Sequence, residues 1–474
     1  MNGPIARLFG VFVLLFALLV VFTSRWTVLE ASSLNNNSLN VRTLLDELKI
    51  KRGRILAADG TVLARSVPAP GNTWSRTYPT GRLFAQPVGF SIAAKGEAIG
   101  LEDSAAPDLR GVQTGLSSIF GQLSPRPVGD DVHTTLDPKG QRAAVQALAG
   151  MHGSVVALDP TTGAVKVMYA NPGYDNNHPP TSSSTTDTTF NRVTQGHYAP
   201  GSTFKIVTAT AAIDTGMYTP NSVINGNSPI TVSGVPLAND GGRSWGPQTL
   251  TTAMTYSINT IFAQVAEHVG RGTMTQYMKR FGFYSKLPLD YPSYQMAISR
   301  PYATPTRAYP PASPDEDIGR IGIGEGGLLV TPLQMAMVAA AVANRGTLMT
   351  PHLTDRVVDQ DGRTVRTVSP TVFSQVMKPS TATEVTRMME NVVEEGTGTA
   401  VQLGGISVAG KTGTAQIGPT GSNLTQPAFV AFAPADHPKV AIAVMVDQSN
   451  GGFGGSVAAP IAKTVLQALL SGGG

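Results

Sequence analysis

Tyr198-Ala-Pro-Gly-Ser-Thr-Phe-Lys205 is the stretch that decides the fold and the chemistry of this 474-residue chain. Pro and Gly break regular structure, and the apolar residues that follow predict a helix from about Ser202 to a C-capping Gly216. Positions i and i+3 share a helix face, so Ser202 and Lys205 can touch. A desolvated lysine with a lowered pKa can take the proton of a serine hydroxyl, and helix N-terminal N–H groups suit an oxyanion. The plain alternative is a capping serine followed by a solvated lysine.

A second motif, Ser257-Ile-Asn259, lies in a segment, 251–265, that we expect to be mainly helical. Residues two apart face different ways on a regular helix, so a shared role for Ser257 and Asn259 implies a loop or a helix end. Ser257 can then relay protons, and Asn259 can orient the lysine and a substrate amide. Taken alone, this pattern is that of an ordinary turn.

The third motif is Lys411-Thr412-Gly413-Thr414, which follows Ile406-Ser-Val-Ala-Gly410 and predicts a strand that lines the site. Lys411 can hold a carboxylate or support the serine relay. Gly413 would let backbone approach a substrate closely. An ordinary edge strand with a solvated lysine is the alternative.

Composition excludes several other chemistries. There is no cysteine, so disulfides, thiolate metal sites and a cysteine nucleophile are excluded. None of the seven histidines lies in the three motifs or shows a metal-ligand spacing, so we expect neither a metal, nor another cofactor, nor a Ser-His-Asp triad. The net charge of +4, without a Lys/Arg block, argues against nucleic acid. Gly322-Ile-Gly-Glu-Gly-Gly327 is interpreted as a turn and not as a dinucleotide loop.

The N-terminus predicts a membrane anchor. Between Arg7 and Arg25 runs an apolar stretch of 17 residues, just long enough to cross a bilayer as a helix. No A-x-A cleavage pattern follows it, and Trp26 suits an interface, so residues 1–25 are interpreted as an uncleaved signal anchor. A buried core helix is the alternative, and the orientation stays open. The polar segment Ala31–Asn40 is expected to be a linker.

Two further domains are expected after the anchor. Residues 26–130 hold the linker and a small, irregular, mainly-β domain, with a hairpin that turns at Asp59-Gly60. Residues 131–474 hold the motifs, a helix from Lys139 to Leu148, and a hairpin formed by 153–159 and 164–169. A strand at 440–446 and a closing helix at 460–470 complete this part. Strands at both ends with helices between them predict an α+β domain, an antiparallel sheet covered by helices.

The chain resembles the class B penicillin-binding proteins of the penicillin-binding protein A type. The three motifs carry the resemblance. Further elements of a transpeptidase domain are Asn191–Gln195, Gly324-Glu325, Val330–Gln334, Ala343–Gly346 and Glu395–Gly398. Arg52-Gly53, Arg76-x-Tyr78-Pro79 and Gly100-Leu-Glu102 look like the family's N-terminal pedestal, or dimerisation-type, domain. The resemblance therefore implies a pedestal at 26–130 and a penicillin-binding transpeptidase domain at 131–474.

The implied activity is that of a membrane-anchored peptidoglycan D,D-transpeptidase with its catalytic domain outside the cytoplasmic membrane. Ser202 would attack the D-Ala-D-Ala carbonyl of a stem peptide with Lys205 as general base, and β-lactams would acylate the same serine. Ser257 and Asn259 would complete proton transfer and orientation. The terminal carboxylate would bind Lys411 and Thr412 with Thr414, beside Gly413, and the N–H groups of Ser202 and Thr414 would form the oxyanion hole. A polytopic membrane glycosyltransferase is the implied partner.

Two rival functions stay open at this point. A serine β-lactamase shares the acylation chemistry and differs in hydrolysing the acyl-enzyme. A non-catalytic scaffold or β-lactam sensor would act through the pedestal and the anchor. The chain also departs from parts of the wider family: there is no room for a glycosyltransferase domain before residue 130, and the aromatic residue common after the K-T-G motif is replaced around Ala428-Phe-Val430. Whether the protein serves elongation or septation is left open, as is the acceptor amine.

Overall fold

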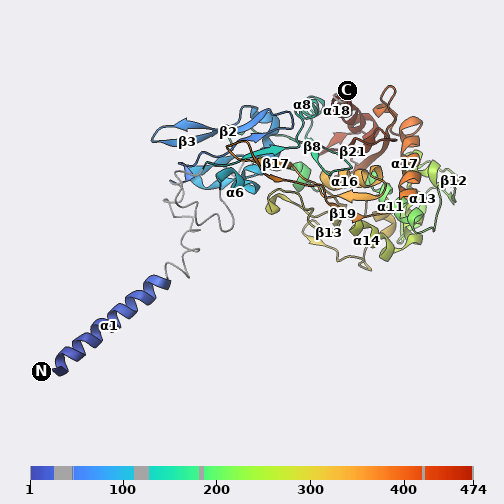
Figure 1. The fold of residues 1–474 in the computed structure, drawn as a ribbon. Coiled ribbons are helices and arrows are strands. Elements are labelled where there is room, and N and C mark those ends of the chain that lie inside the picture. The colour runs from blue at the N-terminus through green and yellow to red at the C-terminus, as the bar shows by residue number, and fades with distance from the viewer. Residues whose placement is uncertain are drawn as a thin grey trace.

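The structure is a computed structural model that describes residues 2–25, 45, 47–111, 128–180, 186–418 and 422–471 (Figure 1). Its first element is the apolar helix α1 (Asn2–Ser24). An 18-residue window within Gly3–Ser24 has a mean hydropathy of 2.8, and none of this window is buried against the rest of the chain. By length and composition the helix can cross a membrane. Trp26 and the expected linker at 31–40 lie outside the described residues.

A six-stranded sheet forms the N-terminal part of the body, in the order β18-β17-β6-β1-β2-β3. The expected hairpin is confirmed: β1 pairs antiparallel with β2, and Gly60 in the turn has φ +84°. The strands are β1 (Ile55–Leu56), β2 (Val62–Ala69), β3 (Thr73–Thr77), β6 (Asp131–Thr134), β17 (Thr354–Val358) and β18 (Thr364–Thr367). Beside them lie α4 (Ala85–Val88), β4 (Ser91–Ile92), β5 (Glu97–Ala98), α5 (Leu101–Ser104) and α6 (Ala106–Arg110).

This sheet draws strands from distant parts of the sequence. β1 pairs in parallel with β6, with Ile55 opposite Val132, and β6 pairs with β17, with Val132 opposite Val357. In Figure 1 the brown β17 accordingly lies beside the blue N-terminal strands. Segments on both sides of position 130 therefore share one sheet. The division of the chain at 130/131 stays a prediction.

Three charged residues from the pedestal motifs meet inside this part of the protein. Glu102 is fully buried, and its two carboxylate oxygens accept hydrogen bonds from Arg52 at 2.9 Å and Arg76 at 2.6 Å. Burial alone would raise the pKa of Glu102, but Arg76 and Arg52 hold it below its ordinary value. The ion cluster thus joins the start of β1, strand β3 and helix α5.

The second large sheet is antiparallel, in the order β20-β21-β22-β7-β8, with β23 pairing with β21. The expected hairpin is confirmed, because β7 pairs with β8 from Gly153 opposite Asn171 to Leu158 opposite Val165. The predicted strand at 440–446 is β22. The strands are β7 (Gly153–Leu158), β8 (Val165–Asn171), β20 (Ala409–Gln416), β21 (Leu424–Ala433), β22 (Val440–Val446) and β23 (Ser449–Asn450).

Helices cover both faces of this sheet, which explains the uninterrupted apolar sequence of β22. Alternate residues of β22 face opposite ways: Ile442 and Val444 belong to the cluster on the α18 side, while Ala441 and Ala443 belong to the cluster on the α16 side. The two predicted helices are α8 (Pro138–Ala147) and α18 (Ala459–Leu470), and the fully buried α16 (Pro332–Ala343) lies on the other face. The expected α+β class is confirmed.

The remaining elements surround this core. The helices are α9 (Thr186–Thr189), α10 (Arg192–Gln195), α11 (Lys205–Asp214), α12 (Leu250–Thr255), α13 (Asn259–Val269), α14 (Arg271–Arg280), α15 (Ile318–Gly322) and α17 (Pro379–Glu394). The short strands are β9 (Val223–Asn225), β10 (Ile230–Val232), β11 (Val235–Leu237), β12 (Pro247–Thr249), β13 (Arg300–Thr304), β14 (Arg307–Ala308), β15 (Leu328–Leu329), β16 (Thr347–Met349) and β19 (Val372–Gln375).

Candidate active site

Ser202 lies in a 3₁₀ turn, η5 (Gly201–Phe204), that leads directly into α11. The predicted helix is therefore present, but its first turn is tighter than an α-helical one, and no Ser202 side-chain cap starts it. At the other end Gly216 follows the last helical turn with φ +76°, the left-handed conformation expected at a helix C-terminus. Ser202 is partly exposed, whereas Lys205 is fully buried.

Glycines let the backbone pack closely around this turn. A Cβ added at Gly413 would lie 2.6 Å from the carbonyl oxygen of Pro200 and 2.8 Å from Thr203 Cγ2. One added at Gly324 would lie 1.9 Å from the carbonyl oxygen of Gly201, whose N–H donates to Gly324 O at 3.1 Å. The side of Gly413 on which a Cβ would stand therefore faces the turn that carries Ser202, while the expected close approach of a substrate to its backbone stays a prediction.

The Ser-x-Asn motif spans a break between two helices. Helix α12 ends at Thr255 and α13 begins at Asn259, with Ser257 between them at φ +60°. A positive φ is uncommon for serine, and it turns the segment sharply enough to bring Ser257 and Asn259 to one place. The expectation that both residues sit at a loop or a helix end is confirmed.

Among the described residues, the hydrogen-bond partners of the Lys205 side chain all belong to this second motif. Its Nζ lies 2.7 Å from Ser257 O, 3.2 Å from Ser257 Oγ and 2.7 Å from Asn259 Oδ1. Burial lowers its pKa well below the ordinary lysine value, and the charge of Lys411 lowers it further. Among the described residues Ser202 Oγ is not a hydrogen-bond partner of Lys205. Catalytic hydrogen bonds are often long before substrate arrives.

Lys411 reaches the same serine from the other side. Its Nζ donates to Ser257 Oγ at 2.9 Å and to Thr412 O at 2.9 Å. Burial lowers the pKa of Lys411 to about 7, and Asp240 opposes that shift. Ser257 Oγ therefore lies between two fully buried lysines, each with a lowered pKa, from two different motifs.

Strand β20 turns polar backbone toward the nucleophile. β20 is the edge strand of its sheet. Just after it, Ile417 N donates to Leu424 O, so Ile417 and Leu424 form a hydrogen-bonded pair, and every second residue pair back along β20 is hydrogen-bonded as well. In this register Thr414 pairs with Pro427 at a non-hydrogen-bonded position, so the Thr414 N–H points away from β21. It points toward η5, since a Cβ on Gly201 would lie 3.2 Å from Thr414 N. The two expected oxyanion donors thus lie on adjoining segments.

The hydroxyls of the third motif already have partners. Thr412 Oγ1 lies 2.6 Å from Thr397 Oγ1, and Thr414 Oγ1 accepts from Gly454 N at 3.1 Å. Phe453, just before Gly454, is 51% exposed. An exposed aromatic residue therefore directly precedes the glycine that contacts Thr414, whereas Phe429 in β21 is fully buried.

Sequence reasoning missed two acidic residues near the lysines. Asp240 acts electrostatically on Lys205 and Lys411, and Glu325 acts on Lys205. Glu325 is exposed as a residue, but desolvation of its carboxyl by the surrounding protein raises its pKa. The charge of Lys205 opposes this shift without cancelling it. Glu325 had a signal in Gly324-Glu325, which we had noted as family-like. Asp240 had none. Within the described ranges no three His, Cys, Asp or Glu side chains cluster as metal ligands.

Comparison with known proteins identifies two domains. Residues 153–467 match the family model of the penicillin-binding protein transpeptidase domain, and residues 52–123 match the penicillin-binding protein A dimerisation domain. Among curated proteins, the peptidoglycan D,D-transpeptidases PbpA of Mycolicibacterium smegmatis and Mycobacterium tuberculosis are 32% and 31% identical, each over 100% of both chains.

Solved structures agree with this assignment. The ceftriaxone acyl-enzyme complex of penicillin-binding protein A from M. tuberculosis is 30% identical, with a TM-score of 0.79 over 90% of this chain and 100% of that one. A D,D-transpeptidase domain from Eggerthella lenta is 31% identical, with a TM-score of 0.76 over 89% of this chain and 99% of that one. Because the transpeptidase match covers more than half of the sequence and full-length relatives exceed 30% identity, the chain belongs to the class B penicillin-binding proteins of the penicillin-binding protein A type.

Proposed function

We propose that this protein is a membrane-anchored peptidoglycan D,D-transpeptidase that cross-links stem peptides through an acyl-enzyme on Ser202. The observation that carries the proposal is the meeting of three motifs around Ser257 Oγ, 3.2 Å from Lys205 Nζ and 2.9 Å from Lys411 Nζ. Family membership supports it, since relatives bear the name of this activity and one is solved as a β-lactam acyl-enzyme.

Acylation begins with proton removal from Ser202. Lys205 is buried and its pKa is well below the ordinary lysine value, so it loses its proton more readily and its neutral form can accept the hydroxyl proton. The Ser202 oxygen then attacks the carbonyl carbon of the D-Ala-D-Ala bond. The N–H groups of Ser202 and Thr414 stabilise the negative charge that develops on the carbonyl oxygen. The substrate carboxylate binds Lys411, Thr412 and Thr414 in place of their present partners.

Departure of D-alanine needs a proton on its nitrogen. Ser257 Oγ contacts both lysines, so it can pass a proton from Lys205 to the leaving amine, while Asn259 holds Lys205 in place. In the second half the amine of a neighbouring stem peptide attacks the acyl-enzyme. The same groups then act in reverse: as the ester bond to Ser202 breaks, the proton lost by the attacking amine passes through Ser257 and Lys205 to the Ser202 oxygen.

The remaining parts would place this chemistry at the membrane. We assign α1 as a single-pass anchor in the cytoplasmic membrane, with the pedestal and the transpeptidase domain on its outer side. A membrane protein that polymerises the glycan strands would be the partner, because a cross-linking enzyme needs newly made strands. We propose the same division as above: an anchor at residues 1–25, a linker and pedestal at 26–130, and a catalytic domain at 131–474.

Labelling with a fluorescent penicillin tests the proposal. The full-length protein in detergent should form a stable adduct, and mass analysis of a digest should place that adduct on Ser202. Ser202→Ala should abolish labelling, whereas Ser471→Ala, at an exposed serine after α18, should label like the wild type. Absence of labelling in the folded wild type would refute the proposal.

The two rival functions give different results. A β-lactamase would turn over nitrocefin rapidly, so the expected outcome is one slow acylation event per protein. A scaffold would not need the nucleophile, so we expect Ser202→Ala to fail to rescue a deletion strain. Rapid nitrocefin turnover, or full rescue by Ser202→Ala, would favour the respective rival.

A further inference from the structure

The proposed reaction leaves one proton of the acceptor amine without a base to take it. An aliphatic amine with a pKa of about 10.4 is almost entirely an ammonium ion at pH 7, and only roughly one molecule in a few thousand is neutral. An ammonium nitrogen must lose two protons before it becomes part of an amide. The relay through Ser257 and Lys205 returns one of them to Ser202, so a second base has to take the other.

A glutamate lies beside the turn that carries the nucleophile. Gly201 N donates to Gly324 O at 3.1 Å, and a Cβ added to Gly324 would lie 1.9 Å from Gly201 O. Glu325 therefore directly follows a backbone contact that is made one residue before Ser202. Its own N–H donates to Arg320 O at 2.9 Å, which fixes the backbone from which the side chain extends.

The carboxyl group of Glu325 lies near Lys205 but is not bonded to it. Each charge acts on the other: Lys205 lowers the pKa of Glu325, and Glu325 opposes the fall in the pKa of Lys205. The Lys205 amine instead bonds to Ser257 and Asn259. Within the described part of the chain, the Glu325 side chain has no hydrogen bond or ion pair, and the residue is exposed. Its carboxylate is therefore free to bind a ligand.

The charges around Glu325 leave it unbalanced in the acyl-enzyme. The neighbouring charged groups are Lys205, Arg320 and Asp317. Arg320 and Asp317 form an ion pair at 2.6 Å and cancel each other. Lys205 gives its proton to the leaving amine in the proposed reaction, so it is neutral when the acceptor arrives. Among these four residues the Glu325 carboxylate then carries the one uncompensated charge, which a cation would balance. Desolvation raises its pKa, which makes it a stronger base than an ordinary glutamate.

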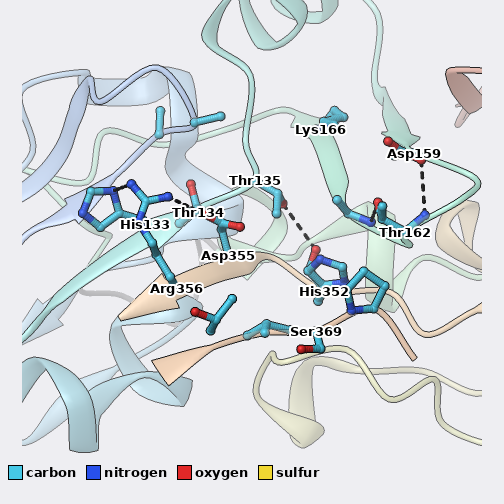
Figure 2. Close-up of a pocket in the computed structure, with 16 residues that line it drawn as sticks. His133, Thr134, Thr135, Asp159, Thr162, Lys166, His352, Asp355, Arg356 and Ser369 are labelled. Carbon is cyan, nitrogen blue, oxygen red and sulfur yellow. Dashed lines mark hydrogen bonds and ion pairs between the residues drawn. The ribbon is translucent and has the colours of Figure 1, made fainter. Parts of the chain in front are cut away.

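The polar cavity where the two large sheets meet offers no such charge (Figure 2). The lysine, arginine and aspartate side chains on its walls are Lys166 and Arg356 against Asp159 and Asp355, and their charges sum to zero. β8, which carries Lys166, is at the opposite edge of the central sheet from β20. The cavity is therefore separate from the catalytic centre, whereas Glu325 adjoins it.

We propose that Glu325 binds the ammonium group of the acceptor stem peptide and takes its first proton. This inference rests on the proposed function, because it needs an acyl-enzyme on Ser202. One N–H bond of the ammonium breaks, and its proton goes to the Glu325 carboxylate. The neutral nitrogen then forms the amide bond as the ester bond breaks, and its second proton reaches the Ser202 oxygen through the relay. Glu325 releases its proton to solvent, because the residue is exposed.

Acyl transfer to two different amines tests this assignment in the full-length protein in detergent. The acyl donor is a thioester of N-benzoyl-D-alanine, and the first burst of thiolate release reports acylation. The acceptors are Nα-acetyl-lysinamide, which is an ammonium ion at pH 7, and hydroxylamine, which is neutral there. Chromatography measures the amide and the hydroxamate. The ratio of the two products cancels any change in acylation, and hydroxamate formation shows that a variant is folded.

Glu325→Gln keeps the size of the side chain and removes its charge. The ratio of amide to hydroxamate at pH 7 should fall at least about a hundredfold, because a general base is worth about 10²–10⁴. Glu97→Gln, at an exposed glutamate in the pedestal, should keep the wild-type ratio. Asp240 acts on both Lys205 and Lys411, so Asp240→Asn tests the other nearby carboxylate. We expect Asp240→Asn to change the ratio less than Glu325→Gln does.

The pH profile of the wild type tests the inference without a variant. Between pH 7 and 9 the wild-type ratio should stay nearly constant, because Glu325 accepts the ammonium form. In Glu325→Gln it should rise about tenfold per pH unit with the neutral fraction of the amine. A tenfold rise in the wild type, transfer to hydroxylamine alone, an unchanged ratio in Glu325→Gln, or a larger loss in Asp240→Asn would each overturn the assignment. Absence of any acyl-enzyme on wild-type Ser202 would refute the proposed function itself.

Discussion

Replacing Ser257 separates the chemistry of the site from its stability. Ser257→Ala removes the one hydroxyl that contacts both Lys205 and Lys411. Lys205 keeps Ser257 O and Asn259 Oδ1 at 2.7 Å each, and Lys411 keeps Thr412 O at 2.9 Å. Neither lysine becomes unsatisfied, so we expect the free energy of unfolding to fall by only about 1 kcal/mol.

The effect on acylation should be much larger. A positioned proton-transfer group contributes about 10²–10⁴ in rate, or roughly 3–5 kcal/mol of barrier. We therefore expect the second-order rate constant for fluorescent penicillin to fall by at least about a hundredfold in Ser257→Ala. Stopped-flow fluorescence gives this rate constant, and urea unfolding gives the stability.

Ser257→Gly is the matched control because it removes the same hydroxyl at a backbone φ of +60°. This conformation costs an L-residue about 1–2 kcal/mol, and glycine avoids that cost. Against this, glycine loses about 0.5–1 kcal/mol more conformational entropy than alanine when the chain folds. The glycine variant should be as stable as the alanine variant or up to about 1.5 kcal/mol more stable, and it should acylate equally slowly. A folded Ser257→Ala protein that acylates within about threefold of the wild-type rate would refute the proton relay, since such a group is worth at least about 10².

Three other changes test neighbouring parts of the structure. Since burial lowers the pKa of Lys411 to about 7, kcat/KM for a carboxylate-bearing substrate should fall as pH rises through about 7, and Lys411→Arg should lack this decline. The unfolded chain binds more protons than the folded one between about 7 and the ordinary 10.5, so stability relative to Lys411→Met should increase with pH across that window; a flat difference would contradict the lowered pKa. Gly413→Ala should cost about 1–3 kcal/mol and slow acylation, because its Cβ would lie 2.6 Å from Pro200 O, whereas Gly404→Ala, in open space, should be neutral in urea unfolding and labelling. Glu102→Gln should destabilise the protein by about 3–5 kcal/mol at pH 7, because Arg52 and Arg76 lose their buried counter-charge. The stability advantage of the wild type over this variant should shrink as pH falls below about 4, where Glu102 becomes protonated. A urea midpoint like that of the wild type at pH 7 would refute this role.

Local sequence predicted the elements that depend on local physics. Pro200-Gly201 and the apolar residues after Ser202 predicted a helix there, and the two-residue spacing of Ser257 and Asn259 predicted a helix end. The apolar run at 440–446 predicted β22, because a strand buried on both faces has no polar alternation. The tight 3₁₀ geometry of η5 escaped prediction, since it is set by contacts with Gly324 and Gly413 far along the chain.

Long-range pairing was beyond the sequence. Strand β17 joins β6 across more than 200 residues, and nothing in the short run Thr354–Val358 identifies its partner. Asp240 belongs to a loop whose neighbour Asn239 accepts a hydrogen bond from Thr260 N at 2.9 Å. That contact carries Asp240 toward the lysines, and a lone aspartate in a glycine-rich loop gives no sign of it.

The sequence by itself determined which chemical groups this protein has: a serine nucleophile, two lysines, a second serine and an asparagine, in motifs without histidine or cysteine. It determined them because hydroxyl, amine and amide groups are properties of single residues. Tertiary structure alone decided the pKa values of the two lysines and which of these groups contact one another. Burial from several segments lowers the pKa of both lysines, and only the fold brings Ser257 Oγ to 3.2 Å from Lys205 Nζ and 2.9 Å from Lys411 Nζ. Desolvation and distance depend on everything that surrounds a group, so no motif can encode them.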